Sequence, residues 1–244
     1  MKKKRGVESK NMHMMNYMNL LMFLICTVIS IYFGATPIIS VSDQTMLLAP
    51  PRELLSFWVL VFFVQGVFVI VQMLPDNRSH PLLSLGVSYW YVLTCGLQIG
   101  WVFAWTKNDL RVSIIAIVFL WLVLGFIVYK QRKMFLNFRK SSWERVDDKS
   151  SREDNRIDES IKMGMMKNVL LCLPFQLYFG WITVMMILQI NFALATYNAE
   201  TVVQIAVSFL SLIILQIVAI LGLLIIRPCH AVSIVIAISS VSEL

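Results

Sequence analysis

Residues 112–129 read VSIIAIVFLWLVLGFIVY, a run of 18 positions without one charged side chain. Runs of about 20 apolar residues have the length that spans the hydrocarbon core of a bilayer. The whole chain shares this bias, because 58% of its 244 residues are hydrophobic and 14% are charged. A soluble domain would have about 25% charged residues. The composition therefore disfavours a soluble enzyme, a disordered chain and a nucleic-acid-binding domain, and it predicts a multi-pass membrane protein.

Five other apolar runs are separated by polar and charged residues, so the sequence predicts six membrane spans. They lie at about Tyr17–Ile39, Leu54–Leu74, Leu82–Trp105, Val112–Tyr129, Val169–Asn191 and Val202–Ile226. Each must be a helix, because open strand edges cannot exist in hydrocarbon. The expected fold class is therefore all-α, a polytopic transmembrane helical bundle. A further run, Ala231–Val241, is short for a crossing, and whether it forms a seventh span or lies at the interface stays open.

Basic residues divide unequally between the two sides of these spans. With the N-terminus inside, 18 of the 21 basic residues fall on inner segments, and only Arg52, Lys107 and Arg111 fall outside. This is the positive-inside distribution. We therefore expect an integral, multi-pass protein with its N-terminus and residues 130–168 on the cytoplasmic side of a membrane that the sequence does not identify. We therefore attribute the net charge of +7 to membrane topology and to contact with lipid head groups, rather than to nucleic-acid binding.

Residues 130–168 are the only long polar stretch, with 11 basic and 7 acidic residues. The first part, Lys130–Trp143, mixes basic and aromatic residues, so we expect it to continue the fourth helix and to lie on an anionic leaflet. The middle, Asp147–Glu159, is almost free of apolar residues and is expected to be a solvated loop.

The residues that usually perform catalysis or ion transport are missing from the predicted spans. None of the six contains an Asp, Glu, Lys, Arg or His. This argues against a proton-coupled pump and against a channel with a charged ring. The three histidines are isolated in sequence, and the cysteines (Cys26, Cys95, Cys172 and Cys229) lie in or beside apolar segments. We therefore expect no catalytic residues, no metal site, no disulfide framework and no enzymatic activity.

Three of the predicted helices each carry a stripe of aromatic and amide residues. At 100° per residue, the members of each stripe fall within an arc of about 80°. The stripes are Trp58, Phe62, Gln65, Val69 and Gln72; Trp90, Thr94, Gln98, Trp101 and Trp105; and Tyr178, Trp181, Met185 and Gln189. We expect them to line a shared cavity for a flat, hydrophobic ligand.

Another interpretation of the stripes stays open. In it the amides bond neighbouring helices, and the tryptophans fill space or mark the membrane interface. Gly96 and Gly100 form a GxxxG on the opposite face of the third span, where close contact with another helix is expected.

The same residues resemble the TspO/MBR family (tryptophan-rich sensory protein or translocator protein), especially its longer, divergent members. The strongest resemblance is LPFQLYFGWIT at residues 173–183, which looks like the Pro-Phe-Ser-Leu-Tyr-x-Gly-Trp-x-Thr segment of those members. Ala49-Pro50-Pro51 stands before Trp58 as at the start of the family's second helix. Gln98-Ile-Gly-Trp101 is similar to its third-helix Asn-x-x-Trp, and Trp121 to the Trp of its fourth helix.

The chain also departs from the family pattern. Gln98 and Gln189 stand where Asn is usual, and Arg52-Glu53-Leu54 stands where typical members have a second Trp. These changes keep the amide chemistry, so the resemblance extends to the type of side chain but does not extend to the detailed ligand preference.

The resemblance implies a TspO-like five-helix core plus one or two C-terminal helices. The corresponding division is a basic N-terminus at 1–16, the core at 17–192 and the additional helices at 193–244. It further implies a pocket that binds a porphyrin (tetrapyrrole) or a sterol by stacking, without ligation of iron. Together with the stripes it singles out these ligand-binding residues: Trp58, Gln65, Gln98, Trp101, Trp121, Tyr178, Trp181 and Gln189.

The expected partners are membrane lipids, a hydrophobic small molecule, and a second copy or a larger membrane complex, since family members are often dimeric. A non-catalytic accessory or structural subunit of such a complex stays open as the alternative function.

Overall fold

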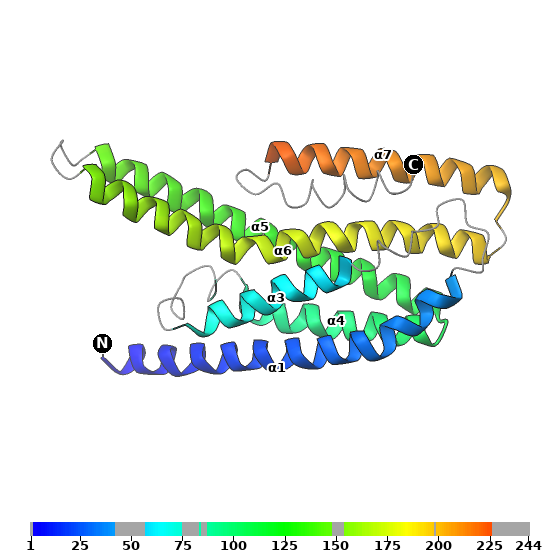
Figure 1. The fold of residues 1–244 in the computed structure, drawn as a ribbon, viewed down its shortest axis with the longest axis horizontal. Helices are drawn as coiled ribbons and strands as arrows, with labels where there is room; N and C mark the ends of the chain where they lie inside the picture. Colours follow the sequence, from blue (N-terminus) through cyan, green and yellow to red (C-terminus); the bar gives the residue numbers. More distant parts are fainter. Residues whose placement is uncertain are drawn as a thin grey trace.

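The computed structural model in Figure 1 describes residues 2–41, 57–74, 83, 87–147, 154–197 and 199–225. The helices are α1 (Lys2–Val41), α3 (Phe57–Met73), α4 (Ser88–Thr106), α5 (Leu110–Asp147), α6 (Asp154–Thr196) and α7 (Thr201–Ile225). These residues contain no strand. The prediction of an all-α helical bundle is confirmed.

Five of the helices form a closed ring around one apolar core. α1 contacts α3 and α4, α4 contacts α5, α5 contacts α6, and α6 returns to contact α3. α7 lies outside this ring and packs against α6, on the opposite side of the bundle from α1 (Figure 1). The expected arrangement of a five-helix core with an additional C-terminal helix is therefore present.

Four helical segments are long and apolar enough to cross a membrane. They are Met14–Phe33, Leu110–Asn137, Leu171–Thr196 and Thr201–Val218. α3 is apolar but only 17 residues long, and α4 is not among the four. The chain is an integral membrane protein, and the total of six crossings stays a prediction. The proposed seventh segment, Ala231–Val241, lies outside the described residues.

The polar stretch at 130–168 is more helical than its composition suggested. α5 continues unbroken to Asp147, as expected, but α6 already begins at Asp154, so residues 154–159 are helical rather than part of a loop. Figure 1 shows α5 and α6 side by side as a hairpin that extends beyond α3. Contact of this segment with an anionic leaflet stays a prediction.

A turn of three residues joins α4 to α5. Asn108 adopts a φ of 55°, in the left-handed region that Asn enters more readily than most residues. The amide of Asp109 donates to the carbonyl of Ala104 at 3.0 Å, in the pattern of a Schellman motif. Asp109 then caps α5, because its Oδ1 accepts a hydrogen bond of 3.3 Å from the amide of Val112. The local sequence thus fixes where one helix ends and the next begins.

Helix α6 passes through Pro174 without ending. Proline has no amide hydrogen, so one bond of the helix ladder is lost there. Gln131 of α5 donates its Nε2 to the carbonyl of Leu171 at 3.3 Å, in the turn before the proline. A side chain from the neighbouring helix thus adds a hydrogen bond to the backbone of the turn that the proline weakens.

The glycines differ in what surrounds them. A Cβ at Gly66 would meet the Phe23 ring at 3.4 Å, and one at Gly125 would meet the Phe179 ring at 3.3 Å. Gly96 and Gly100 are exposed, with no atom of the described residues within 4 Å of such a Cβ. The close helix contact expected at this GxxxG is therefore not found within the part of the chain that the structure describes.

Candidate functional site

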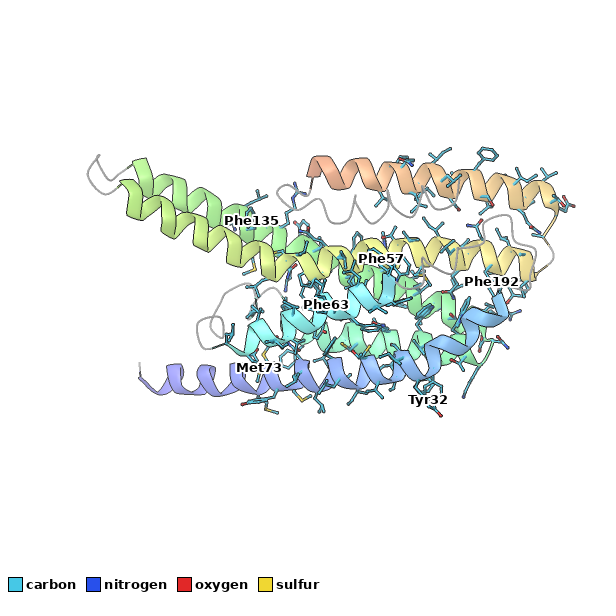
Figure 2. The ribbon with its side chains drawn as sticks, in the orientation of Figure 1. Tyr32, Phe57, Phe63, Met73, Phe135 and Phe192 are labelled. Carbon is cyan, nitrogen blue, oxygen red and sulfur yellow. The ribbon has the colours of Figure 1, made fainter. Side chains whose placement is uncertain are left out.

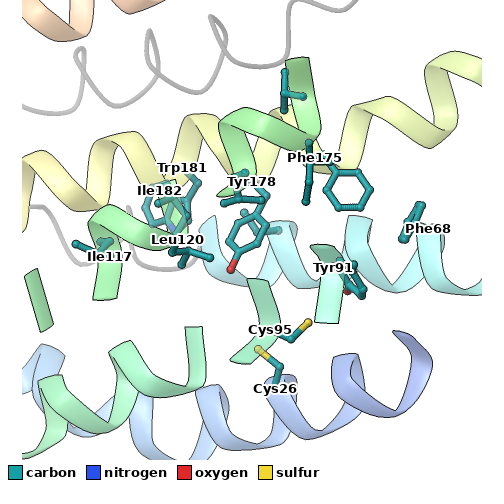
Figure 3. Packing of buried hydrophobic residues seen from close by; sticks show 14 of the residues in the cluster. Cys26, Phe68, Tyr91, Cys95, Ile117, Leu120, Phe175, Tyr178, Trp181 and Ile182 are labelled. Carbon is teal, nitrogen blue, oxygen red and sulfur yellow. The ribbon is translucent and has the colours of Figure 1, made fainter. Parts of the chain in front are cut away.

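The largest fully buried side chains gather where α3, α4 and α6 meet. Trp181, Tyr178 and Phe175 project from successive turns of α6, and Tyr91 and Phe68 approach them from α4 and α3 (Figure 3). The ring of Phe175 lies 4.9 Å from that of Phe68 and 5.7 Å from that of Tyr91. These contacts form the centre of the bundle.

Trp58, near the start of α3, brings the aromatic stripes of the three helices together. Its ring stacks on that of Trp101 at 5.9 Å, meets the Trp181 ring edge-on at 5.8 Å and lies 6.5 Å from the Tyr178 ring. The ring of Phe57, labelled in Figure 2, lies 4.9 Å from the Trp181 ring. Trp58 and Phe57 are half-buried, whereas Trp181 is completely buried. We call Trp58, Trp101, Tyr178 and Trp181 the aromatic cluster.

Two buried glutamines connect the aromatic cluster to other helices. The indole of Trp101 donates to Oε1 of Gln189 at 2.8 Å, and Nε2 of Gln189 donates to the Ser113 hydroxyl of α5. The hydroxyl of Tyr178 donates to Oε1 of Gln98, whose Nε2 donates to the Ser30 hydroxyl of α1 at 3.3 Å. The amides therefore hold α1, α4, α5 and α6 together, as one of the two interpretations of the stripes expected.

Two polar groups beside these rings have no partner among the described residues. Nε1 of Trp181 is buried without a hydrogen-bond acceptor. Gln65 of α3 accepts a bond of 3.0 Å from the Tyr91 hydroxyl, but its Nε2 is buried without an acceptor. A buried donor without an acceptor costs about 1–3 kcal/mol, so an acceptor from outside the described residues would recover this energy.

Trp121 lies apart from the aromatic cluster. On α5 its indole donates to the Thr183 hydroxyl of α6 at 3.0 Å, and its ring stacks on that of Phe179 at 5.6 Å. Trp90, another member of the third-span stripe, meets Phe126 at 4.7 Å instead of the cluster. The structure thus brings together six of the eight predicted site residues directly or through one hydrogen bond. Gln65 lies two turns further along α3 from Trp58, and Trp121 lies elsewhere. That any of them binds a ligand stays a prediction.

Sequence reasoning missed several residues of this region. Tyr91 shares the helical arc of Thr94 and Gln98, so the periodicity that selected the stripe contained the signal needed to include it. Ser30 and Ser113 carry no such signal, because a single serine in an apolar span is common. Their roles follow from which helices are neighbours. No three His, Cys, Asp or Glu side chains come together in the described ranges.

The comparisons with known proteins agree with the arrangement of the helices. A family model described as "TSPO-like protein" matches residues 13–239. No curated protein and no solved structure gives a significant match. The matched range includes all of α7, which the resemblance had placed outside the five-helix core, and the division of the chain at residue 192 stays a prediction. With nearly its whole length matched and the five-helix ring in place, the chain belongs to the TSPO-like protein family.

Proposed function

We propose that the protein binds a flat hydrophobic ligand, a tetrapyrrole or a sterol, at the aromatic cluster between α3, α4 and α6. The observation that carries the proposal is Nε1 of Trp181, a completely buried donor without a partner in the described chain, surrounded by the rings of Phe57 and Trp58. Flat rings offer stacking surfaces to a flat ligand. An unpaired donor among them supplies one directional contact. Apolar rings combined with a few polar groups are typical of small-molecule sites.

The burial of the cluster suggests how a ligand enters. Trp58 and Trp101 stack on each other, so a ligand that takes their place must separate them. Trp58 is the candidate to move, because it is half-buried and makes no hydrogen bond within the described ranges, whereas Trp101 is held by Gln189. A carboxylate of a porphyrin or the hydroxyl of a sterol then accepts from Nε1 of Trp181. The glutamines keep their bonds and position the cluster.

Titration of the detergent-purified protein with protoporphyrin, and separately with a fluorescent sterol, tests the proposal. We expect saturable quenching of tryptophan fluorescence by at least one of them. Trp181→Phe keeps a ring but removes the donor, and should weaken binding by about tenfold, the value of one hydrogen bond. Affinity is measured from the ligand's own absorbance or emission, so that loss of a tryptophan does not bias the result.

Trp90→Phe is the matched control, because Trp90 contacts Phe126 and Lys130 rather than the aromatic cluster. It should bind with unchanged affinity. Absence of saturable binding for both ligands, or equal effects of Trp181→Phe and Trp90→Phe, would contradict the proposal.

A second candidate function is that of a subunit in a larger membrane assembly, including a dimer of this chain. The observation that favours it is the outward face of α4, where Tyr89, Leu93, Gly96, Gly100 and Phe103 are exposed in one row. A GxxxG on such a face allows another helix to approach closely. Co-purification with fixed partners in mild detergent supports this function, whereas a clean monomer argues against it.

A further inference from the structure

Lys130 is the first charged residue after the apolar run 112–129 of α5. Its ammonium lies 5.0 Å from the centre of the Phe126 ring and 5.9 Å from that of the Trp90 ring of α4. The two rings meet edge-on at 4.7 Å, so the cation lies beside aromatic side chains from two neighbouring helices. Aromatic rings attract a cation electrostatically, and the attraction grows as water is excluded.

The direction of the Lys130 side chain is unusual for the end of a membrane helix. Lysines at such positions usually extend their ammonium groups towards water. Phe126 precedes Lys130 by one turn and belongs to the apolar run, so the Lys130 side chain turns back along the helix towards the hydrocarbon. The positive charge therefore lies at the edge of the apolar surface, where lipid head groups meet acyl chains.

The helices around Lys130 supply further positive charge. Lys133 is exposed and lies three residues further along α5, on the same face as Lys130. α4, residues 110–143 of α5 and residues 160–196 of α6 contain no Asp or Glu, and α4 and α6 both pack against α5. An anion that reaches Lys130 along these helices is therefore attracted by their cations and meets no carboxylate of theirs.

A row of exposed apolar side chains continues from Lys130 along the same face of α5. Phe119, Leu122 and Phe126 are all exposed, and with Lys130 and Lys133 they fall within an arc of about 80°. An acyl chain that lies along this row places its head group beside the two lysines. A free phosphate ion would use only the charged end of this surface, whereas a phospholipid uses both parts. The surface therefore fits a lipid better than a soluble anion.

We propose that this face of α5 is a binding site for an anionic phospholipid. Lys130 and Lys133 bind the phosphate, and the rings of Trp90 and Phe126 hold the Lys130 ammonium at the edge of the hydrocarbon. One acyl chain lies along the exposed apolar row. The site is separate from the aromatic cluster, so the inference does not depend on the proposed ligand. It narrows the expected contact of Lys130–Trp143 with an anionic leaflet to one face of one helix.

The test is native mass spectrometry of the full chain in detergent, titrated with phosphatidylglycerol and separately with phosphatidylcholine. Both lipids carry a phosphodiester and two acyl chains, but only phosphatidylglycerol has a net negative charge. We expect phosphatidylglycerol to bind more tightly. Lys130→Gln should weaken its binding by about fivefold, the contribution of one lysine near an anionic membrane surface. Binding of phosphatidylcholine should not change. An excess of inorganic phosphate should not displace phosphatidylglycerol.

Lys107→Gln is the matched control, because it removes the same charge from an exposed position at the opposite end of α4 from Trp90. It should bind phosphatidylglycerol as the unmodified chain does. Lys133→Gln, at another exposed position, is a second variant and should weaken the binding in the same direction as Lys130→Gln.

Three results would overturn the proposal. They are equal affinity of the unmodified chain for the two lipids, equal effects of Lys130→Gln and Lys107→Gln, and displacement of phosphatidylglycerol by inorganic phosphate. The lipid preference of the unmodified chain and the effect of Lys133→Gln decide the matter even where Lys130→Gln fails to fold.

Discussion

Helix α6 meets the bundle interior on one side and α7 on the other, and the two contacts use polar groups differently. On the α7 side, Nδ2 of Asn191 donates to the carbonyl of Ile187 at 2.9 Å and to the Ser211 hydroxyl at 3.0 Å, while its Oδ1 accepts from Ser208 at 3.2 Å. On the interior side, Nε1 of Trp181 has no partner in the described chain. The α7 contact thus uses the hydrogen-bonding capacity of Asn191 to hold the two helices together, whereas the interior leaves one donor without a partner among the described residues.

The largest effect should come from removing the ring at the centre of the interior. Trp181→Ala deletes a completely buried side chain that contacts Phe57 and Trp58. Such truncations cost about 3–5 kcal/mol, because they lose transfer energy and leave a cavity. Thermal unfolding in detergent should show a clear loss of stability. Trp90→Ala, at a partly buried ring, serves as the control, and an equal loss in both variants would mean that the interior is not the better packed region.

A smaller loss is expected from Gln189→Leu. The leucine fills the space but leaves the Trp101 indole without its acceptor and the Ser113 hydroxyl without its donor. One buried group left unpaired costs about 1–3 kcal/mol. The free energy of unfolding measures the effect, and Ser113→Ala, which removes one of these partners, should cost less. Wild-type stability of Gln189→Leu would show that the amide is not a structural link.

Asn191→Leu should weaken the α7 contact alone. Hydrogen bonds between membrane helices contribute about 0.6 kcal/mol on average and at most about 1.7 kcal/mol. We expect faster proteolysis between α6 and α7, near Tyr197, with ligand affinity unchanged. Ser208→Ala should give a weaker form of the same effect, because it removes one bond to Asn191. A fall in ligand affinity in either variant would mean that the two sides of α6 are coupled.

The smallest effect is expected at the exposed glycines. A Cβ at Gly100 has no described atom within 4 Å, so Gly100→Leu should change the stability of an isolated chain by less than about 0.5 kcal/mol. Gly125→Leu is the matched variant, since its side chain meets the Phe179 ring and should cost about 1–3 kcal/mol. Size-exclusion chromatography in mild detergent completes the test. A smaller particle for Gly100→Leu would show that this face binds another helix.

Hydropathy predicts the helices well where they face hydrocarbon and poorly elsewhere. The predicted span Leu54–Leu74 begins three residues before α3 (Phe57–Met73) and ends one residue after it. The polar start of α6 was missed, because Asp154–Glu159 lies outside any apolar run. Transfer into lipid governs the first case, and hydropathy does not report the local terms that form a polar helix.

Periodicity predicts which residues share a face, but not which faces meet. It correctly indicated that Trp58, Trp101 and Trp181 come from stripes on three helices, and the structure shows their rings in contact. Trp121 was added by resemblance alone and lies elsewhere, against Thr183. Cys26 of α1 and Cys95 of α4 face each other in the interior (Figure 3), and this was also out of reach, because it depends on α1 lying beside α4, which no spacing along the chain encodes.

The tight turn between α4 and α5 has a consequence for how the protein enters its membrane. α4 carries Thr94 and Gln98 and is not among the four segments that are long and apolar enough to cross a membrane, whereas Leu110–Asn137 of α5 is the most apolar of those four. Only three residues join them, so neither helix has the length of linker needed to enter separately. The favourable partitioning of α5 therefore offsets the cost of inserting α4, and the two are expected to leave the translocation machinery as one hairpin.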